Sequence, residues 1–250
     1  MAQPVEVQAP CVARGPPFAS PSHPSDRASS ERPGPRGQPH RVWLVTVRWL
    51  LFDVGDVLEV TGDGDWPASW ARRFAERLGM SNEEFDGRVA LAELPAMQVR
   101  TDVEDEYWRR FAAAVGAGQP LMDRMVTDFW DAYCGTLNTE LVEFARSLRG
   151  TVGLAILSNS ADGARREEEL RHRFSATFDP IIYSHEIGVL KPDPAAYAAA
   201  LEAMGASAAE VLFVDNSPVH VEGARRCGIT ALVHEDNATT ITAIRQTMGN

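Results

Sequence analysis

Cysteine and long apolar runs are scarce in this 250-residue chain, and each scarcity excludes a class of protein. The three cysteines, Cys11, Cys134 and Cys227, lie far apart and form no CxxC pair. We therefore expect neither a disulfide framework nor a cysteine zinc site, and we predict a reducing, cytoplasmic location. No apolar run reaches the roughly 18 residues that a membrane helix needs, so a membrane-spanning protein is not expected.

Positive charge is scarce as well, because 24 basic residues face 35 acidic ones and the net charge is −11. Nucleic acids and anionic membranes recruit clustered positive charge, so we expect neither as a partner. The chain contains a single lysine, Lys191, and all other Lys/Arg positions hold arginine. A compact ammonium in a chain that otherwise uses the wide guanidinium indicates a crowded position between anions.

Residues 1–40 differ in composition from the rest of the chain. They hold nine of the 16 prolines and contain no Ile, Leu, Trp or Tyr. Such a segment cannot bury enough apolar surface to offset its ordering entropy, so we predict a disordered, proline-rich N-terminal tail over 1–40. The remaining chain has the apolar and charged content of an ordinary globular protein.

Apolar runs alternate with helical segments over residues 41–60 and 141–250. The runs cover residues 42–52, 152–157, 181–183, 211–214 and 230–233. Helix starts are indicated by Asn138, by Asp193 before Pro194, and by Ser217 before Pro218. Strands that alternate with helices predict an α/β fold with a doubly wound, parallel, Rossmann-like sheet.

Residues 61–140 show helical patterns only. Trp66, Trp70, Phe74 and Leu78 recur at a spacing of four. Ser81 with Glu84, and Thr101 with Glu104, have the spacing of capping boxes, which predicts helix starts at both places. We predict that 61–140 is an α-helical cap domain of about four helices, inserted into the α/β core.

Three predicted strands end in a polar residue: Asp53, Ser158 and Asp215. The carboxyl ends of parallel strands share one edge of a sheet, where ligands bind in open α/β proteins. A single such Asp is more simply explained as a helix cap, but three at one edge favour a functional site.

Four motifs resemble, in chain order, those of the haloacid dehalogenase (HAD) superfamily. They are residues 52–58 (FDVGDVL), 157–160 (LSNS), 188–193 (GVLKPD) and 213–218 (FVDNSP). The insertion after the first motif is similar to the small α-helical cap of subfamily I. Four motifs in order at strand ends are a specific signal. The resemblance implies a phosphatase-like hydrolase that uses Mg²⁺.

The resemblance also implies a role for each matching residue. Asp53 would be the nucleophile that forms an aspartyl-phosphate, and Lys191 would neutralise charge between it and the phosphate. Ser158 and the backbone N–H of Asn159 would hold the phosphoryl group. By the same resemblance, the substrate would be bound by Val54, Gly55, Asn159 and Lys191. Mg²⁺ would be bound by Asp53, the carbonyl of Gly55, Asp215 and Asn216.

Two positions depart from the family's pattern. Active phosphatases carry a general-acid Asp two residues after the nucleophile, and here that residue is Gly55, with Asp56 beside it as a candidate substitute. Asn216 stands where a second carboxylate is usual, and His220 where Asn or Asp is common. Losing a positioned acid matters, because such groups contribute about 10²–10⁴ in rate.

These departures leave three functions open. The first is a Mg²⁺-dependent hydrolase of a small phosphomonoester. The second is a phosphate-binding or regulatory protein that turns substrate over poorly, which the missing acid at Gly55 suggests. The third is a lyase or cyclase acting on an organic (prenyl) diphosphate beneath an apolar cap. Asp215 argues against the metal-free dehalogenases, and the sequence does not indicate an oligomeric state.

Overall fold

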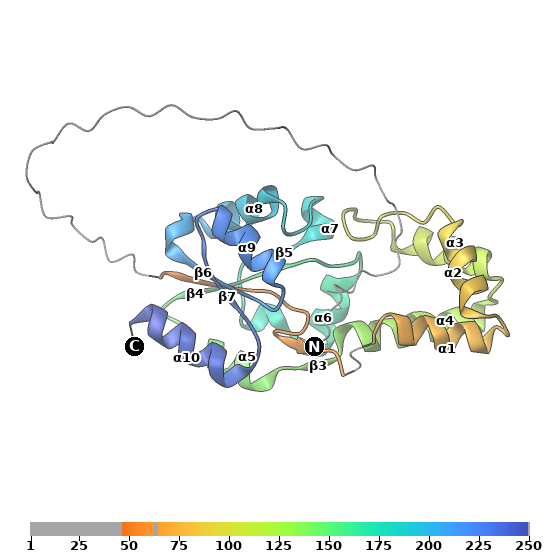
Figure 1. The fold of residues 1–250 in the computed structure, drawn as a ribbon, viewed down its shortest axis with the longest axis horizontal. Helices are drawn as coiled ribbons and strands as arrows, with labels where there is room; N and C mark the ends of the chain where they lie inside the picture. The colour runs from red at the N-terminus through yellow and green to blue at the C-terminus, as the bar shows by residue number, and fades with distance from the viewer. Residues whose placement is uncertain (1–46, 63–64, 250) are drawn as a thin grey trace, which may run out of the picture.

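The computed structural model describes residues 47–62 and 65–249. The tail predicted over 1–40 lies outside these residues. The described chain folds into a parallel sheet with helices on both faces and a four-helix unit at one side (Figure 1). No helix within the described ranges has the length and apolarity to cross a membrane.

The sheet has five parallel strands in the order β5-β4-β1-β6-β7. Their bounds are β1 Trp49–Phe52, β4 Gly153–Ser158, β5 Ile181–Tyr183, β6 Val211–Asp215 and β7 Thr230–Val233. Each of these strands lies within or overlaps a run of apolar residues, as expected for strands covered on both faces. The doubly wound, Rossmann-like α/β fold predicted from the sequence is thereby confirmed.

Alternate side chains of the central strand β1 enter two different cores. Leu50 and Phe52 pack with the helices α5 (Thr139–Ser147) and α10 (Asn237–Met248). Leu51 points the other way, toward α8 (Pro194–Met204) and α9 (Pro218–Arg226). The two pairs of helices therefore cover opposite faces of the sheet (Figure 1). All three side chains are fully buried, and each such burial is worth about 1.5–3 kcal/mol.

Helix starts follow the capping signals in the sequence at four places, among them the helix that begins at Pro218 and the helix Asn82–Ala90, where the side chain of Ser81 accepts a hydrogen bond from the N–H of Glu84. The side chain of Asn138 accepts a hydrogen bond from the N–H of Leu141 at the start of α5. The side chain of Asp193 accepts one from Ala195 at the start of α8. Further helices and turns complete this part: α6 Ala164–His172, α7 Ser184–Ile187, and 3₁₀ turns at Phe174–Ala176 and Ala208–Glu210.

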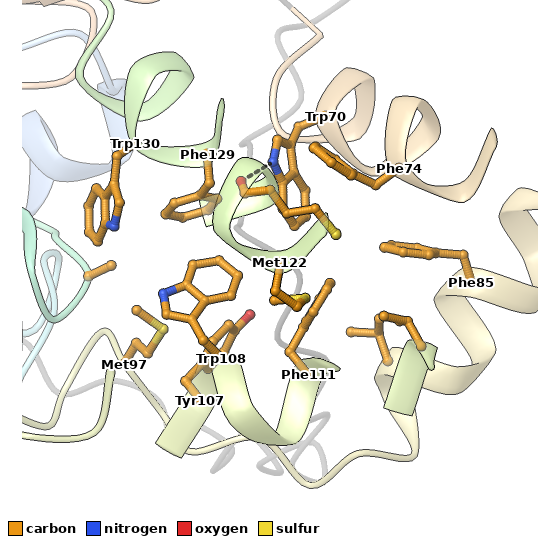
Figure 2. Packing of buried hydrophobic residues seen from close by; sticks show 14 of the residues in the cluster. Trp70, Phe74, Phe85, Met97, Tyr107, Trp108, Phe111, Met122, Phe129 and Trp130 are labelled. Atoms are coloured by element: carbon orange, nitrogen blue, oxygen red, sulfur yellow. Dashed lines mark hydrogen bonds between the residues drawn. The ribbon is translucent and has the colours of Figure 1, made fainter. Parts of the chain in front are cut away.

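The four-helix unit lies between β2 (Glu59–Val60) and β3 (Thr136–Leu137). It contains α1 Ala68–Arg77, α2 Asn82–Ala90, α3 Glu104–Val115 and α4 Gln119–Cys134. Its core is aromatic, and the ring of Trp70 packs against rings from three helices (Figure 2). The indole N–H of Trp70 donates to the carbonyl of Met125 at 3.1 Å. The aromatic residues that recur at a spacing of four in this segment therefore pack inside the unit.

The chain enters and leaves the four-helix unit through a short antiparallel ribbon. Glu59 pairs with Leu137, and Val60 pairs with Thr136. Gly135 precedes β3 with φ of 51°, and a Cβ atom there would collide with the carbonyl of Val60. Glycine is required at this position because both the backbone conformation and the close approach exclude a side chain.

The start of α3 corrects one prediction from the sequence. Thr101 and Glu104 form no capping box, since α3 begins at Glu104 and its first residues are capped from the sheet domain. Asp162, in the loop after β4, accepts hydrogen bonds from the N–H groups of Val103 at 2.7 Å and Glu104 at 2.9 Å. The Glu104 carboxylate also pairs with Arg166 of α6 at 2.9 Å. A long-range cap therefore replaces the local one and ties the four-helix unit to the sheet.

Candidate active site

Asp53, Ser158 and Asp215 lie at the carboxyl ends of three neighbouring strands. Asp53 follows β1, while Ser158 and Asp215 end β4 and β6 on its two sides. The N–H of Asp53 donates to the carbonyl of Val214 at 2.9 Å, which continues the β1–β6 pairing to the nucleophile candidate. All three polar residues are buried. The sheet topology thus brings together what the sequence placed at three separate strand ends.

Lys191 joins two of these carboxylates. Its Nζ lies 2.8 Å from Oδ1 of Asp53 and 2.7 Å from Oδ2 of Asp215, and its side chain is 0% exposed. Asn159 fixes the backbone of the lysine in both directions: its amide donates to the carbonyl of Lys191 at 3.0 Å and accepts from its N–H at 2.8 Å. The only lysine of the chain is therefore clamped between two anions, where a planar guanidinium would be poorly accommodated.

The charges of this group set its protonation. Burial and the nearby charge of Asp215 raise the pKa of Asp53 to about 6, against the opposing effect of Lys191. Burial alone would raise the pKa of Asp215, but the charge of Lys191 and the contact with His220 hold it below its usual range. The two carboxylates keep the pKa of Lys191 above its ordinary value despite burial. At pH 7 the group therefore holds two carboxylates and one ammonium.

The loop after Asp53 turns tightly. The N–H of Val54 donates to Oδ1 of Asp53 at 2.8 Å, and Gly55 is exposed. Asp56 has φ of 53°, and its Oδ1 accepts hydrogen bonds from the N–H of Thr61 at 3.2 Å and from its hydroxyl at 2.6 Å. The other oxygen of the exposed Asp56 carboxylate, Oδ2, makes no hydrogen bond with Thr61.

The loop after Ser158 is held by α7. The hydroxyl of Ser160 lies 2.8 Å from Nδ1 of His185, and the N–H of Ser160 donates to the hydroxyl of Ser184 at 2.9 Å. Ser160 and His185 are both buried. These contacts fix the segment that carries Ser158 and Asn159.

His220 is a site residue whose role the sequence did not predict. Its Nδ1 lies 3.2 Å from each carboxylate oxygen of Asp215, and its side chain is 12% exposed. One signal could have found it: the residue falls in the first turn of the helix that begins at Pro218, directly beyond Asp215. Asn216, the predicted metal ligand, follows Asp215 in the chain and is half-buried.

Asp53, Asp215 and His220 form a possible cation site. Their ligand atoms all lie within 4.8 Å of one another, and no second group of three or more such side chains occurs in the described parts of the chain. The two carboxylates supply oxygen donors, which a hard divalent cation prefers, and the imidazole adds a nitrogen donor. The donor set therefore fits a divalent cation.

A second pair of carboxyl groups is buried near the β2–β3 ribbon. Glu59 and Glu168 are 1% and 0% exposed, and among the described residues the Oε1 atom of each lacks a hydrogen-bond partner. Tyr183 donates to Oε2 of Glu168 at 2.5 Å. His172 approaches Oε1 of Glu59 at 3.3 Å without hydrogen-bond geometry, since its Nε2 lies 3.0 Å from the carbonyl of Cys134. No pattern in the sequence predicted this pair.

A parallel α/β sheet with an Asp–Lys–Asp group at its carboxyl edge and helices inserted after the first strand defines a class of hydrolases. The model of the haloacid dehalogenase-like hydrolases matches residues 50–228. The chain belongs to this family, and it is a hydrolase of the HAD superfamily.

Individual relatives are more distant. The bifunctional epoxide hydrolase 2 of Rattus norvegicus is 25% identical over 151 residues, which cover 58% of this chain and 27% of the relative. The chain thus spans about a quarter of that protein. The phosphoserine phosphatase of Thermus thermophilus is 34% identical over 89 residues, covering 35% of this chain and 36% of the enzyme.

Solved structures share the fold. The HAD family enzyme bt-2542 of Bacteroides thetaiotaomicron matches with a TM-score of 0.63 at 18% identity, over 79% of this chain and 98% of that one. A complex of the same enzyme with magnesium and inorganic phosphate matches with a TM-score of 0.61 at 20% identity, over 78% and 98% of the chains. At these identities the likeness establishes the fold.

Proposed function

We propose that this hydrolase is a Mg²⁺-dependent phosphatase that acts on a small phosphomonoester through an aspartyl-phosphate. The observation that carries the proposal is the Lys191 bridge. Lys191 and the N–H of Val54 both bind Oδ1 of Asp53, which leaves Oδ2 without a hydrogen-bond partner among the described residues. A carboxylate held by one oxygen, with the other free, is an oriented nucleophile.

The reaction would proceed in two displacements. Oδ2 of Asp53 attacks phosphorus, the ester P–O bond breaks, and the leaving oxygen takes up a proton. Water then attacks the phosphorus of the aspartyl-phosphate, which releases inorganic phosphate and restores the carboxylate. Lys191 neutralises charge on the side of Asp53 that faces Asp215, so that the approach of an anionic substrate meets less repulsion.

Asp53, Asp215, the carbonyl of Gly55 and Asn216 would hold Mg²⁺ in this proposal. A bound divalent cation would screen the charge of the phosphate from that of the attacking carboxylate. The Ser158 hydroxyl and the N–H of Asn159 would hold the phosphoryl oxygens, supported by the α7 contacts of their loop. The backbone of Val54 and Gly55 would line the same position.

The proton for the leaving group needs a donor, since Gly55 has no side chain. Asp56 is the neighbouring carboxyl group, and Thr61 leaves its Oδ2 free. We assign the donor role to it as part of the proposal. The four-helix unit would act as the cap over 61–140 that selects the substrate, because its contacts through Asp162 and Glu104 reach the loop after Ser158.

The relatives agree with this chemistry without extending it to a substrate. One is a phosphoserine phosphatase, and bt-2542 has been crystallised with magnesium and phosphate. The match to the epoxide hydrolase covers only 27% of that much longer protein. A cytoplasmic location remains a prediction from the isolated cysteines.

The decisive experiment compares Asp53→Asn with the wild-type protein. Release of phosphate from p-nitrophenyl phosphate and from a panel of small phosphomonoesters, with Mg²⁺, is expected to fall to background in the variant, because an amide is not a nucleophile. Asp128→Asn is the matched control, since it removes the same charge at the outer face of α4 and should retain activity.

Two outcomes would count against the proposal. Absence of turnover across the panel, while inorganic phosphate still raises the melting temperature, would favour a phosphate-binding or regulatory protein. Conversion of a prenyl diphosphate to a hydrocarbon or alcohol would favour the lyase or cyclase alternative.

A further inference from the structure

The position of His220 links α9 to the carboxylates at the sheet edge. β6 ends at Asp215, α9 begins at Pro218, and His220 lies in its first turn. The N–H of Ser217 donates to Oδ1 of Asp215 at 2.8 Å, which fixes the connection between strand and helix. The short, bonded connection holds the imidazole against Asp215 at 3.2 Å from both oxygens.

The imidazole is part of a compact donor set. Its ligand atom lies within 4.8 Å of those of Asp53 and Asp215, although Lys191 already binds one oxygen of each carboxylate. The set therefore combines two carboxylates, one nitrogen donor and an ammonium. With Asn216 uncharged, the two carboxylates and Lys191 leave one net negative charge to attract a dication.

We infer that a ring nitrogen of His220 is a ligand of the catalytic cation, and that this nitrogen lets the site bind first-row transition dications such as Mn²⁺ or Co²⁺ in place of Mg²⁺. The inference rests on the proposed function and refines its cation. Mg²⁺ binds through oxygen and gains little from imidazole, whereas the transition dications accept nitrogen readily. Where the negative charge is low, a nitrogen ligand compensates for the ionic attraction that the site lacks.

The nitrogen ligand can be tested with the metal alone. Mn²⁺ is added to the full-length protein without substrate, and pulsed electron paramagnetic resonance records coupling to ¹⁴N. We expect the coupling in the wild-type protein and in His234→Asn, a control that removes a half-buried histidine outside the donor set. His220→Asn should lose it. Wild-type protein carrying ¹⁵N-histidine should show the altered coupling without any substitution.

Cation preference supplies the second measurement. Calorimetric titration should show that His220→Asn binds Co²⁺ at least about 10-fold more weakly, as is usual when a metal site loses a supporting group. Its affinity for Mg²⁺ should remain within about twofold of the wild type, because the amide offers oxygen in place of nitrogen. Circular dichroism establishes that the variant is folded.

The results separate this inference from the proposed function. Absence of ¹⁴N coupling in the wild-type protein, or equal loss of Co²⁺ and Mg²⁺ affinity in His220→Asn, would overturn the role of His220. Phosphatase activity that depends on Asp53 would still stand in that case. Nitrogen coupling without phosphate release from any ester would support the metal site and refute the phosphatase.

Discussion

The described part of the chain contains two pairs of buried carboxyl groups, and the neighbours of the two pairs differ. Asp53 and Asp215 share Lys191. Glu59 and Glu168 have tyrosine and histidine neighbours but no lysine or arginine bonded to either carboxyl group among the described residues. Burial affects both pairs, so the partner accounts for the difference between them.

The partner decides the charge. Next to Lys191, the pKa of Asp215 falls below its usual range even though burial opposes the change, and that of Asp53 rises only to about 6. In the second pair, burial together with the neighbouring carboxyl charge raises the pKa of Glu59 well above its ordinary value, and burial raises that of Glu168 to about 8. One pair is therefore ionised at neutral pH, as the proposed nucleophile requires, while the other retains protons.

Removal of the lysine should have the largest effect. In Lys191→Met the two carboxylates face each other without a cation, and kcat/KM for a phosphomonoester should fall by about 10³, the loss typical of a missing electrostatic group. Lys191→Arg keeps the charge and should recover little, because the wide guanidinium does not fit between the carboxylates. Full activity of Lys191→Arg would show that charge alone, without shape, is sufficient.

Asp56 provides an exposed carboxylate outside both pairs. If it protonates the leaving group, Asp56→Asn should slow an alkyl phosphate by about 10²-fold or more and leave p-nitrophenyl phosphate nearly unchanged, since nitrophenolate needs no proton to depart. Kinetics with the two esters make the comparison. Equal losses for both would mean that Asp56 only holds the turn through Thr61.

Glu168 should produce the smallest effect, and it concerns stability. Its pKa is about 8 in the folded protein, against an ordinary value of 4.5, so the folded state binds more protons between these values. The free energy of unfolding should therefore decrease as pH rises from 4.5 to 8, by about 5 kcal/mol for a shift of this size. Glu168→Gln, which cannot ionise, should flatten that dependence.

Urea unfolding at a series of pH values provides the measurement. Glu202→Gln, at an exposed position on α8, is the control and should retain the slope of the wild type. An unchanged slope in Glu168→Gln would assign the pH dependence to other groups and remove the contrast between the two pairs.

Much of the fold could be predicted because its signals are local. The strands are runs of consecutive apolar residues, and α5 and α8 start at capping residues such as Asn138 and Asp193. The group of Asp53, Ser158 and Asp215 followed from one rule about parallel strands. Lys191 was indicated by its rarity and its motif, and the structure places it between two of these carboxylates.

The features that sequence reasoning missed depend on contacts between distant segments. Asp162, in the loop after β4, caps α3 of the four-helix unit. The sequence pattern instead indicated Thr101, because it lies close to the start of the helix. Glu59 and Glu168 come from a strand and a helix far apart in the chain, and their meeting has no periodic signal. The contact between His220 and Asp215 could not be predicted, because it depends on how the Ser217 connection folds between strand and helix.

The burial of Lys191 has a practical consequence for chemical labelling. Its side chain is 0% exposed, and the chain has no other lysine, so an amine-directed reagent finds no accessible ε-amino group in the folded protein. Acylation of Lys191 would require the sheet edge to open. The rate at which such a reagent modifies this one residue, followed by mass spectrometry, would therefore measure how often the site opens.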